Sequence, residues 1–373
     1  MSVLTWRSAL TRSISPVFYM LVVGFGLLAG LTANADPSLK KIAFDQKFAL
    51  TRQLEPVLSD PLLENSTVGI HIVNVRTKEE VFSYNADKAL IPASVMKAVT
   101  SAVALKRLGP DFRFKTKVYT TGKIEKGTLD GDLYIVGGGD PTLLVEDLWK
   151  IIHELQMKGL NRVNGNVYYD NSLFDGENLI AGWGKKVDIA NGPSYFPLTS
   201  SLSVNWNNVS LKVRPGSEAG QKANVYFEFP ASFLKIKNQV KTGPLKSRPQ
   251  IEVMRKLSNG TMTYTLKGSI PKGLEKPWTF YRTVHRPAEY FSEMMQSMMK
   301  SKSFAVKGKH KAGKKPDNAS LFYTRHSQPL RELIAYMNKY SQNLIAEHLM
   351  FQLGVQAKEG APATIEDGIK VVS

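Results

Sequence analysis

Residues 91–97 read IPASVMK, at the start of a predicted helix over residues 93–108. Pro92 suits a helix start, and valines and leucines recur on one side of the segment. Ser94 and Lys97 are three residues apart and so share one helical face. A lysine that is partly desolvated against a buried helix has a lowered pKa and can accept the proton of a serine hydroxyl, while the helix N-terminus favours the resulting alkoxide. Ser94 and Lys97 are therefore a candidate nucleophile and general base, although S-x-x-K is a common pattern that also fits a capping serine and a surface lysine.

The sequence around this helix indicates an α/β (α+β) protein with a long β-rich insertion. A hairpin is expected over residues 67–84, before the helix. Residues 115–280 contain repeated strand-like runs and one helix, at about 143–157. Further helices are expected at 288–299, at 329–340 and at 343–353 with Gly354 as the stop, and Thr364 and Asp367 start a last one. We accordingly divide the chain into residues 1–35 (a leader), 36–115, 116–285 (the insertion) and 286–373.

Serine acylases of the S-x-x-K type also need an S-x-N motif and a K-T-G motif. Residues 203–205 match S-x-N and residues 241–243 match K-T-G, in the required order. Both lie in the β-rich insertion, where neither a helix junction nor a strand beside the serine helix is expected. Ser341 and Asn343 lie at the junction of two predicted helices, where both side chains can point into a cleft. The same residue types are also favoured as helix caps. We take Ser341 and Asn343 as the second motif, and no K-T-G follows them.

Other chemistry is poorly supported by the sequence. The three glycines at 137–139 lack a phosphate-binding context and predict a turn, with Asp140 as a helix N-cap and Pro141 at the first helical position. The six histidines show no metal-ligand spacing, and the absence of cysteine removes thiol catalysis and Cys-ligated metals. We expect no cofactor and no metal.

The N-terminus and the net charge suggest an exported, basic protein. Residues 1–35 carry two charges, Arg7 and Arg12, then an uncharged run and a small-residue triplet, the order typical of a cleavable secretory signal. An uncleaved membrane anchor is the alternative. The 373 residues carry a net charge of +17, and removing the leader would leave +15. Such a surface favours anionic envelope polymers, the cell wall or acidic lipids rather than DNA, and residues 300–315 hold seven lysines and no acids.

Several strings together resemble the D-alanyl-D-alanine carboxypeptidase/endopeptidase family, the low-molecular-mass class C penicillin-binding proteins. They are PASVMK (92–97), LKRLGPDFRFKT (105–116), LDGDLYIVGGGDPTL (129–143), GNVYYDNSLF (165–174), SLSVNWNNV (201–209) and SQPLRELIAYMNKYSQNLIAEHL (327–349).

This resemblance implies a penicillin-binding-protein/β-lactamase-like serine transpeptidase domain at 36–115 and 286–373, interrupted by the insertion. It also implies a periplasmic serine peptidase that acts on peptidoglycan stem peptides and cross-links and is inhibited covalently by β-lactams. By the same resemblance, Ser94 would be acylated, Lys97 would be its base, Ser341 would carry a proton to the leaving amine and Asn343 would bind a substrate amide. Asp170 resembles an acidic residue that faces the amine of the substrate side chain.

The family's third motif, K-T-G, and the strands that carry it would be expected beyond Ser373. On that expectation the domain is incomplete at its C-terminus, and the sequence is either a fragment of a longer enzyme or a truncated product. An inactive wall-binding or partner-binding remnant is therefore the alternative function. A β-lactamase-like hydrolase is a further alternative, which the long insertion disfavours. The preferred stem-peptide diamino acid, the balance of carboxypeptidase and endopeptidase action and the oligomeric state are left open.

Overall fold

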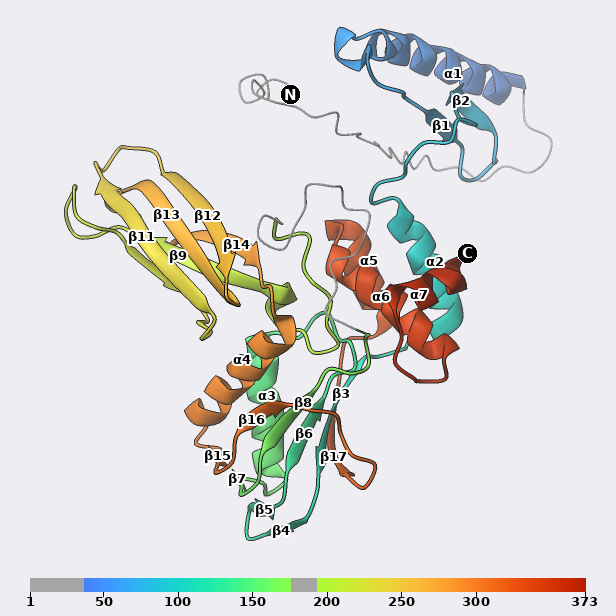
Figure 1. Cartoon of the computed structure of the whole chain (residues 1–373). Helices are drawn as coiled ribbons and strands as arrows, with labels where there is room; N and C mark the ends of the chain where they lie inside the picture. The colour runs from blue at the N-terminus through green and yellow to red at the C-terminus, as the bar shows by residue number, and fades with distance from the viewer. Residues whose placement is uncertain (1–36, 176–192) are drawn as a thin grey trace. The chain divides into compact units, whose positions relative to one another are not determined.

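The computed structural model describes residues 37–175 and 193–373 (Figure 1). The predicted leader lies outside these residues. The chain separates into two compact units, Met1–Met96 and Lys97–Ser373. Among the helices of the described residues, none combines the length and the apolar character needed to span a bilayer.

The first unit contains a helix, a short 3₁₀ turn and the predicted hairpin. The helix α1 spans Pro37–Leu58, and the 3₁₀ turn spans Pro61–Leu63. Strands β1 (Ile70–Val73) and β2 (Glu80–Tyr84) pair antiparallel, which confirms the hairpin expected from the sequence.

The second unit contains a five-stranded mixed sheet in the order β16-β8-β6-β3-β17. Its strands are β3 (Lys115–Thr120), β6 (Leu133–Val136), β8 (Val167–Asp170), β16 (His310–Ala312) and β17 (Ser320–His326). A smaller sheet, β15-β7-β5-β4, is formed by β4 (Lys123–Glu125), β5 (Thr128–Asp130), β7 (Arg162–Val163) and β15 (Ala305–Val306). Helices α3 (Val145–Met157) and α4 (Pro287–Ser301) pack against each other and bury their apolar sides in the core of this part.

Two three-stranded sheets make a sandwich within the same unit. One sheet, β10-β9-β14, comprises β9 (Asn208–Arg214), β10 (Asn224–Phe227) and β14 (Trp278–Thr283). The other, β11-β13-β12, comprises β11 (Leu234–Gly243), β12 (Gln250–Ser258) and β13 (Thr261–Pro271). Along these strands, buried residues alternate with more exposed ones, as expected for strands with one side buried. The inner faces of the two sheets meet in contacts such as the edge-to-face pair Phe227–Tyr264.

The remaining helices form a second core. Helices α2 (Met96–Leu108), α5 (Leu330–Tyr340) and α6 (Asn343–Ala357) contribute to a hydrophobic cluster centred on Phe114, Met337 and Leu349. Helix α7 (Ile365–Val372) packs on α6.

Three sequence expectations about helix ends differ from the structure. Helix α2 begins at Met96, not at residue 93. Gly354 does not stop α6, which continues to Ala357. A Cβ at Gly354 would lie 3.0 Å from the Cβ of Asp367, so this glycine permits close packing of α6 and α7 rather than a helix end. Asp140 does not cap α3, because the cap position is Leu144.

Strand pairing also continues beyond the expected end of the insertion at residue 285. Strands β15, β16 and β17 pair with β7, β8 and β3, so residues 305–326 complete sheets that began before residue 170. Pairing between segments so distant in sequence leaves no local signal. The sheet-forming part of the chain therefore extends to His326, while the division into domains stays a prediction.

Candidate active site

Ser94 lies in the turn that precedes α2 and is exposed. The turn is closed by the backbone N–H of Met96, which donates to the carbonyl of Ala93 at 3.2 Å. Ser94 belongs to the first unit and Lys97 to the second, so the sequence spacing of three residues is what relates them.

Lys97 and Asn343 meet in the second unit although 246 residues separate them. Lys97 Nζ, on the first turn of α2, donates to Asn343 Oδ1 at 2.6 Å, and both residues are buried. Asn343 is the first residue of α6, and its Nδ2 donates to the carbonyl of Tyr195 at 2.7 Å. The amide of Asn343 is thereby fixed from both ends. The structure thus brings together the lysine of S-x-x-K and the asparagine of S-x-N.

Glu347 is a site residue that sequence reasoning missed. It lies four residues after Asn343 on the same face of α6 and is buried. Burial lowers the pKa of Lys97, and the negative charge of Glu347 partly opposes that shift. The spacing of four residues from Asn343 within a predicted helix was the available signal.

Ser341 forms the junction between α5 and α6. It adopts the left-handed conformation (φ 55°, ψ 40°), uncommon for a residue with a side chain, and the following N–H, of Gln342, donates to the carbonyl of Met337 at 3.0 Å. Helix α5 is joined to α2 near this point, because Asn338 Nδ2 donates to Ser101 Oγ at 3.1 Å. Ser341 is exposed at the helix junction that the sequence predicted.

Residues of the segments 203–205 and 241–243, which match S-x-N and K-T-G but were not taken as site motifs, have structural roles. Asn205 Oδ1 accepts the first backbone N–H of α3, from Val145, at 3.2 Å, and so caps that helix. Thr242 Oγ1, at the end of β11, accepts the N–H of Gly216 at 2.7 Å. Ser203 is buried and donates to the carbonyl of Ser200 at 2.8 Å.

Asp170 is buried at the end of β8, and both its carboxylate oxygens have partners. One oxygen accepts from the hydroxyl of Ser172 at 2.6 Å and from its N–H at 3.0 Å. The other accepts the backbone N–H of Lys315 at 2.7 Å. A substrate amine would have to share these oxygens, so the binding role suggested for Asp170 stays a prediction.

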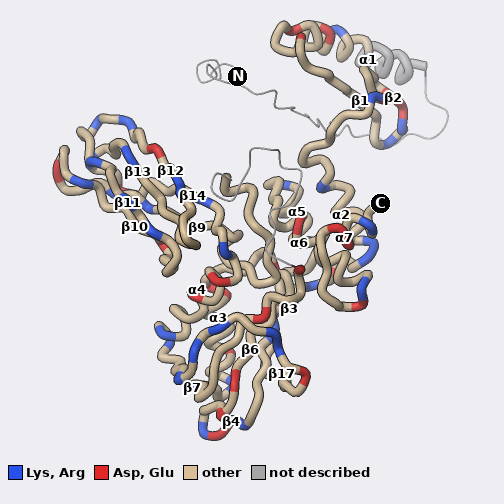
Figure 2. Tube along the Cα trace, viewed as in Figure 1, with Lys and Arg blue, Asp and Glu red and all other residues tan. Residues whose placement is uncertain are grey.

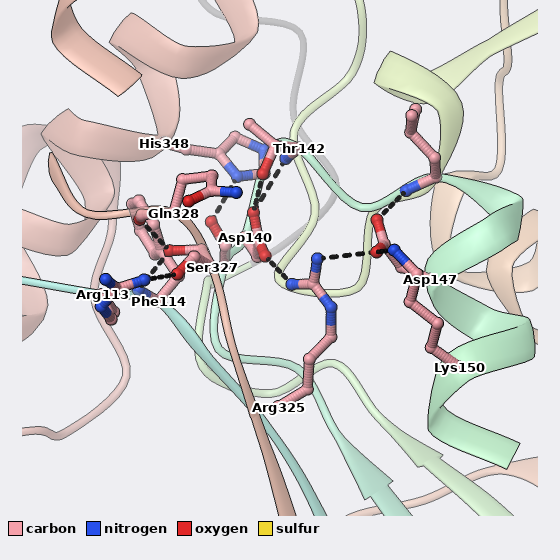
Figure 3. A network of polar contacts seen from close by, with 12 residues as sticks. Arg113, Phe114, Asp140, Thr142, Asp147, Lys150, Arg325, Ser327, Gln328 and His348 are labelled. Carbon is pink, nitrogen blue, oxygen red and sulfur yellow. Dashed lines mark hydrogen bonds and ion pairs between the residues drawn. The ribbon is translucent and has the colours of Figure 1, made fainter. Parts of the chain in front are cut away.

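A buried polar network lies beside α6 (Figure 3). Asp140 accepts from Arg325 at 2.6 Å, and Arg325 also contacts Asp147 at 3.1 Å. Burial raises the pKa of Asp140, and Arg325 opposes that rise. The carbonyl of Gly139, one residue earlier, accepts from Nδ1 of His348 at 2.8 Å, and burial lowers the pKa of His348 to about 4. The neutral His348 therefore ties α6, which carries Asn343, to the segment that follows β6.

Within residues 37–175 and 193–373, no cluster of His, Cys, Asp or Glu side chains could hold a metal ion. The described residues include a lysine with a lowered pKa, held by an amide and placed three residues after an exposed serine. These features define a candidate serine acyl-transfer site.

Comparison with known proteins identifies the family. The chain belongs to the D-Ala-D-Ala carboxypeptidase 3 (S13) family, whose model matches residues 50–373. It is 30% identical over 342 residues to a D-alanyl-D-alanine carboxypeptidase of Actinomadura sp. (strain R39), covering 89% of this chain and 62% of that protein. It is 28% identical over 296 residues to D-alanyl-D-alanine carboxypeptidase DacB of Haemophilus influenzae, covering 78% of this chain and 60% of that protein.

The fold is similar to that of a solved relative. Penicillin-binding protein 4 (dacB) of Haemophilus influenzae superposes with a TM-score of 0.69 at 24% identity, covering 83% of this chain and 67% of that one. This likeness confirms the predicted fold class, a penicillin-binding-protein-type serine peptidase fold. The chain spans about three-fifths of the length of the curated relatives it matches.

Proposed function

We propose that this chain acts as a serine-type D-alanyl-D-alanine carboxypeptidase and endopeptidase through an acyl-enzyme on Ser94. Family membership and the names of the relatives support the reaction class. The observation that carries the proposal is the 2.6 Å contact between Lys97 Nζ and Asn343 Oδ1. That contact assembles two of the three motif elements that this kind of catalysis uses.

The residues would divide the reaction as follows. Neutral Lys97 accepts the proton of Ser94 as Oγ attacks the carbonyl carbon of the penultimate D-alanine, and the lowered pKa of Lys97 favours that neutral form. Ser341 passes a proton to the nitrogen of the departing D-alanine. Asn343 holds Lys97 in place through Oδ1, and its Nδ2 would bind the substrate with its second hydrogen, since the first donates to the carbonyl of Tyr195. Water then attacks the ester on Ser94 and releases the shortened peptide and the free hydroxyl.

β-Lactams are the corresponding covalent inhibitors, since their strained amide acylates the same serine. The Haemophilus influenzae relative has also been solved in complex with a β-lactam. Peptidoglycan stem peptides in the periplasm are the proposed substrate and location, supported by the leader-like residues 1–35 and the basic composition. Association with the wall or a membrane through basic surface belongs to the same proposal.

Labelling with a fluorescent penicillin, read by intact mass, tests the site. The wild-type chain should gain one penicillin adduct, and Ser94→Ala should lose it because no hydroxyl is left to acylate. Ser83→Ala, an exposed serine in β2 of the same unit, is the matched control and should keep the adduct. An adduct that survives Ser94→Ala would remove Ser94 from the mechanism.

A further inference from the structure

Figure 2 shows basic residues in the sheet β11-β13-β12, and lysines lie on each of its three strands. The alternation of burial along each strand puts these lysines on the solvent side of the sandwich. The strand register aligns Lys235 and Lys256 on either side of Thr263, and Lys237 beside Thr265. We call this surface the lysine face; its lysines are Lys222, Lys235, Lys237, Lys241, Lys256 and Lys267.

The chain does not neutralise these charges. Within the part of the chain that the structure describes, none of the six amines forms an ion pair or a side-chain hydrogen bond. Glu252 is the one acidic residue in β11, β12 and β13, and although it lies directly beside Lys267 in register, the two form no ion pair. Lys222 lies directly opposite Lys241, an arrangement of like charges that destabilises a sheet.

Protection of sheet edges explains part of this pattern, because lysines on outer strands prevent edge-to-edge aggregation. Lys235, Lys237 and Lys256 fit that explanation, since β11 and β12 are the outer strands. Lys267 does not, because β13 is the central strand and has no free edge. The opposed pair of Lys222 and Lys241 also costs stability without adding protection. An anionic partner would account for both.

The geometry of the face indicates what kind of anion it fits. From Lys235 to Lys241 the array extends about 20 Å along the strand, and from β11 to β12 about 10 Å across. The charges are ammonium groups on long flexible stems, which attract anions as point charges, rather than guanidinium forks set in a pocket. A plane of cations matches a plane of phosphates better than a single polymer strand. We propose that the lysine face docks on the surface of an anionic phospholipid bilayer, which specifies the membrane association of the proposed function and does not depend on the catalytic site.

Sedimentation of the full chain with vesicles tests the proposal. The chain should bind phosphatidylglycerol–phosphatidylcholine vesicles more tightly than vesicles of phosphatidylcholine alone, and the difference should shrink as salt is added. The test variant is Lys237→Gln, Lys256→Gln and Lys267→Gln, which removes one charge from each strand. At about fivefold per lysine, its partition coefficient on anionic vesicles should fall roughly a hundredfold.

The matched control removes three charges elsewhere. The control variant combines Lys307→Gln, Lys309→Gln and Lys314→Gln, which change exposed lysines of the lysine-rich segment 300–315. Its partition coefficient on anionic vesicles should fall no more than about fivefold, which corresponds to the contribution of one lysine. Equal losses in the two variants, or no preference of the wild-type chain for anionic vesicles, would overturn the proposal. So would a test variant that keeps its vesicle binding but loses binding to soluble polyphosphate, because that result would assign the face to a polymer.

Discussion

Lys97 illustrates how a single side chain acquires its chemistry from its surroundings. Burial on α2 disfavours its charged form and lowers its pKa, whereas the carboxylate of Glu347 acts in the opposite direction. Asn343 Oδ1 accepts from Nζ at 2.6 Å and so fixes where the amine is held. A general base for a serine hydroxyl must be neutral at working pH, and the balance between burial and Glu347 sets the pH at which this form appears.

Replacing Glu347 by glutamine should shift the pH profile of penicillin acylation. Without the negative charge, the opposing effect of Glu347 is lost, so the pKa of Lys97 falls further. The proposed mechanism needs neutral Lys97 for acylation, so the acidic limb of the profile should move to lower pH. The measurement is the second-order rate of fluorescent-penicillin labelling across pH.

Glu332→Gln removes the same charge from an exposed position on α5 and is the control. Its profile should coincide with that of the wild-type chain. A limb that stays in place in Glu347→Gln, with labelling intact, would mean that Lys97 is not the base whose titration limits acylation.

The network of Asp140, Arg325 and Asp147 joins β17 to the turn after β6 and to the start of α3. The Asp140 side chain has no exposed surface, whereas Arg325 is 16% exposed. A buried carboxylate that loses its cation is destabilising because its desolvation is no longer offset. This contact therefore holds together elements that are distant in sequence.

Arg325→Gln should lower the free energy of unfolding by about 3 kcal/mol or more, measured by urea denaturation. Burial already raises the pKa of Asp140, and the loss of Arg325 would raise it further. The folded state then holds the proton more tightly than the unfolded state, so stability falls as pH rises through this range. The destabilisation should therefore be smaller in acid than at neutral pH.

Arg331→Gln is the control, since its ion pair with Asp111 is exposed. This change should cost less than about 1 kcal/mol. Equal costs for the two variants would show that the buried network contributes no more than a surface pair.

The elements that the sequence predicted are those with local signals. Thr364 and Asp367 marked the start of α7, where the structure shows a capping box, and two strand-like runs around a turn marked the hairpin β1–β2. The contact of Lys97 with Asn343 could be predicted only from the S-x-x-K and S-x-N motifs, because 246 residues separate the two. For Glu347, the one local signal is its helical spacing from Asn343. The meaning of Gly354 depends on a second helix that packs against it, which the local sequence does not encode.

The second unit has two main hydrophobic cores. One joins the five-stranded sheet, α3, α4 and the sandwich, and includes Ile135, Leu148 and Leu266. The other joins α2, α5 and α6 and includes Met337. The hydrogen bond from His348 to the carbonyl of Gly139 links the two parts. The lysine of S-x-x-K and the S-x-N motif both lie on the helices of the second core.

Met337→Ala should therefore weaken the site-bearing core more than the sandwich. Met337 is fully buried, and its truncation should cost about 2–5 kcal/mol. Because stability is distributed over cooperative parts, amide hydrogen exchange should accelerate in α2, α5 and α6, while β9 to β14 stay protected. Leu266→Ala, in the central strand β13, is the reciprocal variant and should accelerate exchange in the sandwich instead. Uniform acceleration by either variant would mean that the two cores unfold as one.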